Sequence, residues 1–347
     1  MKPNVLTAFY LVFSLAVAVA CYLRPSQDDF DRYVYESLIR SARHQPLEEI
    51  YQIVKHESPR AEASSIMDSP SHLAQLEPLY AIRPLYLKLA GFLALRFSPE
   101  QSINLISAAS MFLIAILCLQ YTCSHLYSAL LVIASGIIIL GRLGTPDALS
   151  TLIVALSCVL ILKDRLLLGI VLLMVSIWIR TDNVLVALTM LGWLVWNRKL
   201  AVGYATVLAS LAAGSVEYIN WLSGNYGWKV LLHYSFVGGR YPSEITAGIT
   251  PMQYLRTFAV NAESLLPQIS LFVLLGIAAW VIENSPDRKL LPPVLIAAVA
   301  RYMLFPSGDV RYFGWACLLT GLVFIRALEM RSAPAVVEAF RLKEAAA

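Results

Sequence analysis

The chain has 347 residues, of which 58% are hydrophobic and only 14% are charged, with a formal net charge of +4. A soluble domain usually carries about 25% charged residues, so this chain has too few charges to cover a water-facing surface of its size. The composition therefore excludes a soluble enzyme, a disordered protein and a nucleic-acid binder, and it predicts an all-α, polytopic membrane protein. The five cysteines form no CxxC pair or Cys/His cluster, which argues against a disulfide framework or a zinc site.

Apolar stretches follow one another along most of the chain, and a transmembrane helix needs about 17–25 such residues. We expect ten spans, at residues 5–23, 103–121, 128–143, 148–162, 166–179, 184–196, 200–219, 265–282, 290–305 and 313–325. Several stretches are short, so their helices must extend into the polar flanks. The first stretch also resembles a signal peptide, because small residues precede Cys21, but we favour an uncleaved span since the rest of the chain is itself membrane-embedded.

Residues 79–97 are also apolar, but Arg83, Lys88 and Arg96 interrupt them. A charged side chain at the bilayer centre costs roughly 2.5–3.5 kcal/mol on insertion scales. We therefore predict a helix that lies on the membrane surface, with a spanning helix as the alternative.

The distribution of lysine and arginine sets the orientation, because short cytoplasmic loops carry an excess of both. With the N-terminus in the cytoplasm, the basic segments 163–165, 197–199 and 283–289 all face the cytoplasm, as does the tail at 331–347. Counting residues 79–97 as a span would move most of these groups to the other side. We therefore predict a multi-pass protein of the cytoplasmic (inner) membrane.

The same topology gathers acidic residues on the non-cytoplasmic face, together with two long loops at 24–101 and 220–264. The acidic residues on this face include Asp28, Asp29, Asp31, Asp147, Asp182 and Asp309. We therefore expect one integral-membrane domain over residues 1–330, with a single external site covered by the two loops.

The first long loop contains the clearer local patterns. Residues 27–38 are typical of a helix that begins just above the membrane, with Asp28 or Asp29 able to cap its first turn. Residues 48–55 predict a second short helix. The second loop is rich in aromatic residues, which are typical of an interfacial belt but also stack on sugar rings.

In order and spacing, these segments resemble the GT-C glycosyltransferases, polytopic enzymes that use polyprenyl-phosphate sugars. Asp28 and Asp29 match the acidic motif that opens the first external loop of that superfamily. The Arg-Pro-Leu-Tyr stretch at 83–86 is similar to the juxtamembrane segment that follows, and the Thr-Pro-Asp stretch at 145–147 to a second acidic element before the fourth span. The Asp-Asp pair is similar to the arabinofuranosyl- and mannosyltransferase-like branches.

This resemblance covers about residues 1–200, and later it extends only to an Arg-Tyr pair at 311–312. It implies an inverting transfer of a sugar from a polyprenyl-phosphate donor to an acceptor hydroxyl at the outer face of the cytoplasmic membrane. The implied base is Asp28, with Asp29 next, because a carboxylate beside the membrane can take the acceptor proton. The acceptor, whether a glycan, a lipid or a protein, stays open.

The leaving phosphate calls for cations, and arginine suits it because the planar guanidinium binds two oxygens and keeps its charge. The expected residues for binding the donor phosphate and the substrate are Arg311, Arg240, Lys229, Arg180, Asp147, Asp182 and Tyr312. Arg301 lies inside a predicted span, where it either marks a functional site or pairs with an aspartate of another helix. Local alternatives exist for the others, because Asp147 could cap a helix and Arg180 could simply pair with Asp182.

The five histidines are scattered along the chain, so we expect no histidine metal site. Binding of Mg²⁺ or Mn²⁺ by Asp28, Asp29 and Asp147 stays open, since both metals accept carboxylate oxygens.

Two other functions compete with glycosyl transfer. A transporter or flippase of a lipid-linked or small polar substrate would explain charges in the membrane, but the chain shows no internal repeat of the kind that transporters carry. A non-catalytic membrane subunit would leave Asp28 and Asp29 free to vary without loss of activity.

Overall fold

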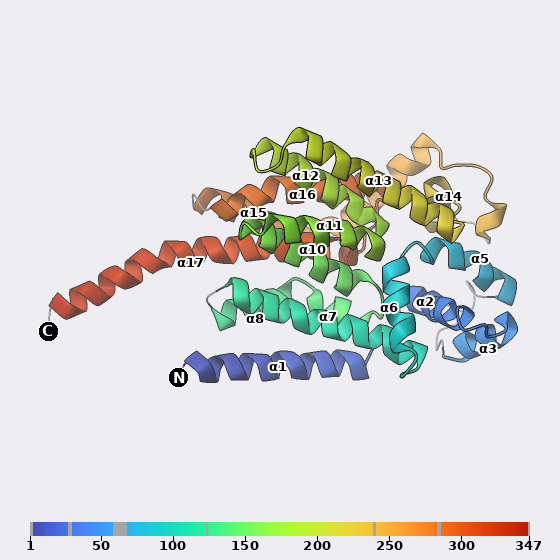
Figure 1. The fold of residues 1–347 in the computed structure, drawn as a ribbon, viewed down its shortest axis with the longest axis horizontal. Coiled ribbons are helices and arrows are strands. Elements are labelled where there is room, and N and C mark those ends of the chain that lie inside the picture. The colour runs from blue at the N-terminus through green and yellow to red at the C-terminus, as the bar shows by residue number, and fades with distance from the viewer. Residues whose placement is uncertain are drawn as a thin grey trace.

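The computed structural model describes residues 3–26, 30–57, 68–122, 124–238, 241–282 and 286–345, and every regular element in these ranges is a helix. Figure 1 shows long helices that run side by side as a bundle, with a group of shorter helices at one end. This end is named the loop end, and its short helices are α2 (Phe30–Ser41), α3 (Leu47–Glu57), α5 (Pro70–Tyr80) and α14 (Trp228–Phe236).

The bundle follows the predicted apolar stretches closely. Its helices are α1 (Pro3–Leu23), α7 (Pro99–Tyr121), α8 (His125–Ala134), α9 (Ile137–Arg142), α10 (Asp147–Leu162), α11 (Leu166–Ile179), α12 (Val184–Trp196), α13 (Val202–Ser223), α15 (Pro251–Ile282), α16 (Leu291–Leu304) and α17 (Gly314–Ala345). Short 3-10 helices connect some of them: η1 (Thr181–Asn183), η2 (Pro242–Glu244), η3 (Pro286–Leu290) and η4 (Val310–Phe313).

Five helical segments are long and apolar enough to cross a membrane. They are Val5–Leu23, Pro99–Tyr121, Val202–Ser223, Pro251–Ile282 and Val310–Arg331. The other five predicted spans coincide with shorter helices; α10, for example, has 16 residues, or about 24 Å at 1.5 Å per residue, against a hydrocarbon core of about 30 Å. The helices therefore support a membrane-embedded protein, while the number of spans stays a prediction.

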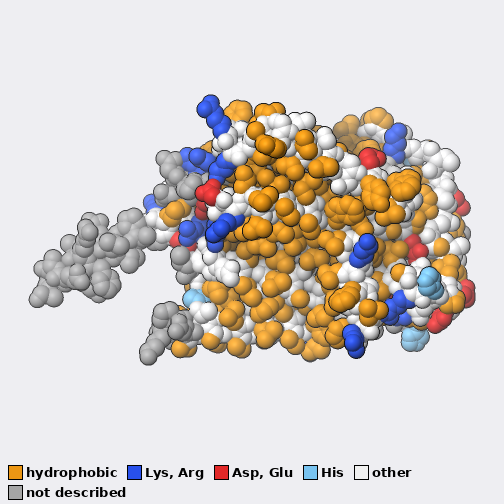
Figure 2. Space-filling model, in the orientation of Figure 1, with side chains coloured by type: hydrophobic (Ala, Val, Ile, Leu, Met, Phe, Trp, Pro, Cys, Tyr) orange, Lys and Arg blue, Asp and Glu red, His pale blue; other side chains and the backbone are white. Residues whose placement is uncertain are grey.

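The outer surface of the bundle is apolar. Figure 2 shows hydrophobic side chains over its middle, with most charged side chains toward the two ends. Phe9 on α1 is 69% exposed and Leu167 on α11 is 76% exposed. Side chains of this kind gain stability only where an apolar medium removes them from water, which is what the hydrocarbon interior of a bilayer provides.

The stretch at 128–143 is broken in two rather than forming one helix. α8 ends at Ala134, and α9 begins after Gly136, which has a φ of +73°. Residues with a Cβ atom rarely adopt this left-handed conformation, so a glycine at this position permits the break. The break leaves Ser135 and Gly136 facing a cavity rather than packed inside a continuous helix.

The apolar stretch at 79–97 is also divided. α5 ends at Tyr80 and α6 (Pro84–Leu93) begins at a proline, which suits the first position of a helix because its missing N–H would be unpaired there. α6 is only 10 residues long, and in Figure 1 it lies across the loop end of α7 rather than along the bundle. This orientation agrees with the expectation that residues 79–97 do not form a span.

The predicted helices of the first long loop correspond to α2 and α3. One face of α2 packs against α3 and α5 through a small core that includes Tyr33 and Val34. Its other face packs against α6 and α7 through Tyr35 and Ile39. α2 therefore joins the short helices of the loop end to the bundle. Asp28 and Asp29, expected to cap this helix, lie outside the described residues.

The second long loop is shorter than predicted, because α15 begins at Pro251 rather than near residue 265. Thr250 and Gln253 explain the early start. The backbone N–H of Gln253 donates to Thr250 Oγ1 at 3.3 Å, and the backbone N–H of Thr250 donates to Gln253 Oε1 at 2.8 Å. This reciprocal capping box satisfies two N–H groups and fixes the beginning of the helix.

Candidate functional site

Charged residues from distant parts of the chain meet at the loop end of the bundle. They come from the start of α2, the α5–α6 turn, the start of α10, the α11–η1 junction, the end of α16 and η4. Together they form the Arg–Asp cluster: Asp31, Arg83, Asp147, Arg180, Asp182, Arg301, Asp309 and Arg311.

The first half of the cluster is centred on Arg180, at the end of α11. Its guanidinium donates to Asp147 at the start of α10, and its Nε and Nη2 atoms donate to the two oxygens of Asp182, each at 3.1 Å. Asp182 also lies 2.5 Å from Nε of Arg301, in the last turn of α16. Three helices are thus joined by two arginines and two carboxylates.

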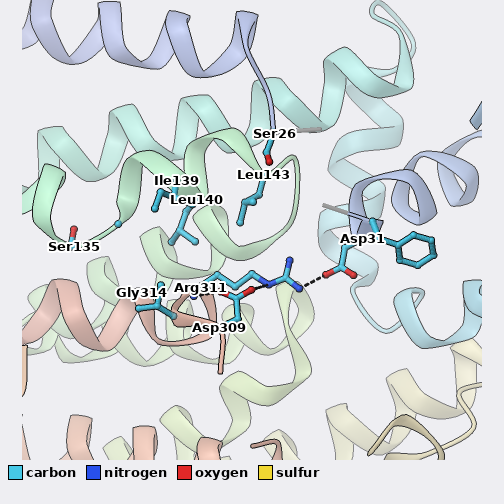
Figure 3. A pocket seen from close by; sticks show the side chains of 12 residues that line it. Ser26, Asp31, Ser135, Ile139, Leu140, Leu143, Asp309, Arg311 and Gly314 are labelled. Atoms are coloured by element: carbon cyan, nitrogen blue, oxygen red, sulfur yellow. Dashed lines mark hydrogen bonds and ion pairs between the residues drawn. The ribbon is translucent and has the colours of Figure 1, made fainter. Parts of the chain in front are cut away.

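The second half of the cluster is centred on Arg311 in η4, and Figure 3 shows its side chain reaching between two aspartates. Its Nη2 atom lies 2.8 Å from Asp31 on α2, and its Nε atom lies 2.8 Å from Asp309. Tyr80 of α5 donates its hydroxyl to the other oxygen of Asp31 at 2.6 Å. Arg311 therefore ties the short helices of the loop end to the segment that opens α17.

The ring of Tyr312 connects the two halves. The guanidinium carbons of Arg180, Arg301 and Arg311 lie 5.0, 4.8 and 5.0 Å from its centroid. A cation over an aromatic face is attracted by the ring's quadrupole within about 6 Å. The ring thus holds three guanidinium groups near one another, where their repulsion is offset by the ring and by the adjacent carboxylates.

Arg83 occupies the neighbouring position on the α5–α6 turn. Its guanidinium lies 5.5 Å from the ring of Tyr35 and 5.4 Å from the ring of Tyr80, and its Nη1 atom donates to the carbonyl of Leu79 at 3.0 Å. Arg83 also acts on Asp31 and Asp182 through space.

The environment of Asp31 and Asp182 keeps both carboxyl groups ionised. Burial alone would raise the pKa of Asp31, but Arg311, the hydroxyl of Tyr80 and Arg83 outweigh it, and the pKa lies below its usual range. Burial would likewise raise the pKa of Asp182, yet Arg180 and Arg301 hold it well below its usual range. A carboxylate with so low a pKa accepts protons poorly, so these two aspartates suit the positioning of arginines better than general-base catalysis.

A cavity of about 410 Å³ opens beside the Arg–Asp cluster. Asp31, Asp309 and Arg311 form its charged end, while Leu140 and Leu143 contribute to an apolar wall. Figure 3 shows Ser135 at the far side of this cavity from Asp31, beyond the apolar wall. A volume of this size and a wall of mixed character suit a ligand with a charged head and a hydrocarbon tail.

The structure brings together most of the predicted binding residues that it describes. Arg180, Asp147, Asp182, Arg311 and Tyr312 all belong to the site, and Arg301 pairs with Asp182, one of the two alternatives left open for it. The ion pairs of Arg180 with Asp182 and of Arg311 with Asp309 are present, but they are parts of a larger network.

Lys229 lies elsewhere. It is exposed on α14, and within the described ranges no ion pair joins it to the Arg–Asp cluster. The predicted catalytic residues Asp28 and Asp29, and the predicted phosphate ligand Arg240, fall outside the described residues.

The sequence interpretation missed three parts of the site. Asp31 was counted only among the acidic residues of its face. Arg83 was counted as a charge that interrupts residues 79–97 and as part of the juxtamembrane-like stretch at 83–86, and Tyr80 only as a residue of the apolar stretch. An arginine within an apolar stretch was the available signal for Arg83, because such a charge needs a partner. Asp31 carried no comparable signal, since its partner Arg311 lies near the other end of the chain.

Of the three aspartates for which metal binding was left open, Asp28 and Asp29 lie outside the described residues and only Asp147 can be placed. Both oxygens of Asp147 accept hydrogen bonds, one from Arg180 and one from Thr145. In the part of the chain that the structure describes, no three His, Cys, Asp or Glu residues are grouped so as to hold a metal ion. Comparisons with protein-family models, curated proteins and solved structures found no match.

Proposed function

We propose that the protein is an inverting glycosyltransferase of the GT-C type, which moves a sugar from a polyprenyl-phosphate donor to an acceptor hydroxyl. The observation that carries the proposal is the cavity beside the Arg–Asp cluster, with Arg311 at one end and an apolar wall at Leu140 and Leu143. A phosphate joined to a long hydrocarbon chain has the same two parts. The guanidinium would bind the phosphate, and the wall would contact the first units of the chain.

Arg311 is the main phosphate ligand in this proposal. Of its two carboxylate partners, Asp309 has a side chain that is 48% exposed and Asp31 one that is 19% exposed. The more exposed Asp309 is the partner that a phosphate would replace, because water can solvate it once it is released. Asp31 would stay in place and keep the guanidinium oriented.

The reaction is a single displacement at the anomeric carbon. A base takes the proton of the acceptor hydroxyl, the acceptor oxygen bonds to the anomeric carbon, and the bond from that carbon to the phosphate oxygen breaks. The electron pair of the broken bond leaves on the polyprenyl phosphate, whose negative charge Arg311 and its neighbours stabilise. Asp28 is the proposed base, and Asp29 is the next candidate. Both are close to Asp31 in the sequence, and Asp31 itself is a poor base because its pKa is lowered.

The proposed topology completes the assignment. Ten spans, with the N-terminus in the cytoplasm, would place the Arg–Asp cluster on the non-cytoplasmic face of the cytoplasmic membrane. The helix break at Gly136 and the short helices α10 to α12 would then lie inside the membrane beside longer spans, where neighbouring helices shield the broken backbone.

The test is to replace Asp28 and Asp29 by Asn, singly and together, and to analyse the envelope glycans of the host. We expect loss of one sugar linkage with normal insertion of the protein, because the amide cannot take the acceptor proton. Unchanged glycans with a properly inserted double variant would refute the catalytic assignment. The same glycan analysis of the Arg311→Ala variant tests the proposed phosphate ligand of this site, and we expect loss of the same sugar linkage.

Transport of a lipid-linked or small polar substrate is the second candidate, and the helix break favours it. Transporters often bind substrate at discontinuous helices near the middle of the membrane, and the α8–α9 break at Gly136 lines the same cavity. Purified protein in vesicles separates the two functions. A transferase forms a new glycosidic bond when donor and acceptor are on one side, whereas a transporter changes only the side on which the substrate is found.

A further inference from the structure

A second polar cavity lies between α14 and the first turns of α15, and it is named the α14–α15 cavity. Its volume is about 380 Å³, within the range of ligand-binding pockets. It is lined by Phe236, Val237, Gln253, Arg256, Thr257, Val260 and Asn261. None of these residues belongs to the Arg–Asp cluster.

The polar residues of this cavity lie on one face of α15. Gln253, Thr257 and Asn261 recur every four residues, a spacing that places side chains above one another on a helix. α15 has 32 residues, or about 48 Å, and therefore exceeds a hydrocarbon core of about 30 Å. Because the apolar stretch of this helix begins near residue 265, its first turns would extend beyond the hydrocarbon in the proposed topology, where polar ligands could reach them.

These side chains offer donors and acceptors without a carboxylate. Arg256 and Thr257 make no side-chain hydrogen bond or ion pair within the described ranges, so both can serve a ligand. Gln253 accepts at its oxygen from Thr250, and its amide nitrogen adds a donor. Phe236 contributes an aromatic face from α14. Hydroxyl, amide and guanidinium groups beside an aromatic ring are the surroundings that sugar rings favour.

The α14–α15 cavity and the Arg–Asp cluster border the same short segment. Asn261 packs so closely on Gly308 that a Cβ atom there would lie 3.2 Å from Asn261 Oδ1 and 3.0 Å from Ser264 Oγ. The carbonyl of Gly308 also accepts from Gln268 at 3.0 Å. Gly308 precedes Asp309, which lines the first cavity. One lining residue of each cavity, Asn261 in one and Asp309 in the other, therefore adjoins Gly308.

The end of α16 holds both helices of the cavity in place. Trp228 of α14 donates to the carbonyl of Leu304 at 2.6 Å, and Tyr254 of α15 donates to the carbonyl of Met303. Carbonyls in the last turn of a helix lack partners within that helix, so these bonds satisfy them. The cavity thus has a fixed position relative to Arg301, one turn earlier on α16.

We infer that the α14–α15 cavity is the acceptor site, and that the acceptor is the end of a glycan chain. This inference rests on the proposed function, since it assigns the acceptor of the same transfer. A lipid acceptor would instead need an apolar wall that continues into the membrane, whereas four of the seven lining residues here carry polar side chains.

The test uses thiol protection in the purified full-length protein. Val260 lines the cavity and is 57% exposed, and the four cysteines within the described residues are buried. Val260→Cys, in a chain whose fifth cysteine, Cys123, is replaced by Ser, therefore gives a reporter for a charged maleimide. The probe is the oligosaccharide mixture that mild acid releases from the host's own envelope. Leu255→Cys is the matched control, because Leu255 is 59% exposed on the same helix but does not line the cavity.

We expect the probe to slow labelling of the Val260→Cys variant and to leave labelling of the Leu255→Cys variant unchanged. Arg256→Leu should weaken protection about tenfold, and Thr257→Val about fivefold, as expected for losing a charged and a neutral hydrogen bond. Neither change removes a side-chain hydrogen bond or an ion pair within the described residues, so folding should be kept. Labelling of Val260→Cys that is equally fast with and without the probe would overturn the inference.

A transfer assay separates this result from the proposed function. If Arg311-dependent transfer occurs but Arg256→Leu and Thr257→Val leave the acceptor KM unchanged, the acceptor site is wrong and the transferase stands. If the probe protects the Val260→Cys variant but no donor supports transfer, the glycan site stands and the transferase is wrong. A rise in acceptor KM with an unchanged donor KM supports both.

Discussion

Replacing Arg311 by Ala tests the Arg–Asp cluster most severely, because Arg311 joins η4 to α2. The change leaves two carboxylates without their guanidinium partner. Asp309 has a side chain that is 48% exposed and can be solvated, but the side chain of Asp31 is only 19% exposed. The cost therefore comes mainly from Asp31.

The expected loss can be scaled from the contacts that remain. Removing one partner of a buried ion pair typically costs about 3–5 kcal/mol, because the other charge stays buried and unpaired. Asp31 keeps the hydroxyl of Tyr80 at 2.6 Å and the nearby charge of Arg83. We therefore expect Arg311→Ala to lower the free energy of unfolding by about 3 kcal/mol, at the lower end of that range.

The assay is unfolding of the purified protein by SDS in mixed micelles, for Arg311→Ala, Asp31→Asn and the double variant. The double variant should recover part of the loss, with a coupling energy of about 1–3 kcal/mol, because Asn leaves no buried charge behind. A coupling energy near zero would refute the assignment of Asp31 as the partner of Arg311.

The pH dependence of the unfolding free energy tests whether the ionised carboxyl group of Asp31 stabilises the fold. The pKa of Asp31 is below its usual range in the folded protein, so the stability that this group contributes is present above the unfolded pKa, about 3.9, and is lost as the pH falls below it. Arg311 makes the largest contribution that lowers the pKa of Asp31, so without it that pKa rises and the stabilising contribution of the carboxylate shrinks. The difference in stability between wild type and Arg311→Ala should therefore narrow below about pH 4. A difference that stays constant from neutral pH into acid would contradict the argument.

Arg326 provides a matched control on α17, the helix that follows η4. Its side chain is 29% exposed and pairs with Glu329 at 3.4 Å and Asp287 at 3.9 Å. Arg326→Ala should cost less than Arg311→Ala, since its ion pairs are longer and its own side chain is more exposed, at 29% against 14%. It should leave glycosyl transfer unchanged, because it lies far along α17 from Arg311.

Other parts of the molecule give three further predictions. Asp182→Asn should lower the free energy of unfolding by about 3 kcal/mol or more, since it leaves Arg180 and Arg301 buried without their shared carboxylate; a loss under about 1 kcal/mol in SDS titration would contradict this. Gly136→Val should destabilise by about 1–2 kcal/mol through backbone strain alone, because no atom lies within 4 Å of the added Cβ, and an unchanged unfolding curve would show that the left-handed conformation is unimportant. In whole cells that express the protein with Cys123 replaced by Ser, the Ser235→Cys variant should react with an impermeant maleimide added outside. The Ser124→Cys variant should react only after the cells are permeabilised; the reverse pattern would overturn the proposed topology.

Apolar stretches located most bundle helices, because a helix in a membrane must be apolar along its length. The errors occurred where a local feature overrides hydrophobicity. Gly136 divides the predicted span at 128–143, and Pro84 begins a new helix inside the stretch at 79–97. α15 begins early because Thr250 and Gln253 form a capping box, a signal that was present in the sequence but lies outside the apolar stretch.

The candidate site was less accessible from sequence. Arg180 and Asp182 are two residues apart, and Arg301 is a charge in an apolar stretch, so each carried a local signal. The pairing of Asp31 with Arg311 and the sharing of Tyr312 by three arginines depend on how distant helices pack. No spacing rule predicts such contacts, because residues such as Asp31 and Arg311 lie far apart in the sequence and meet only in the folded bundle.

The central claim is that the Arg–Asp cluster binds the phosphate of a polyprenyl lipid, and native mass spectrometry of the protein purified in mild detergent tests it most directly. Wild type and Arg326→Ala should each carry a bound species with the mass of a polyprenyl phosphate or its sugar-linked form, and Arg311→Ala should lose it. Equal retention by Arg311→Ala and Arg326→Ala, or a complete lack of such a species after addition of polyprenyl phosphate to wild type, would contradict the account.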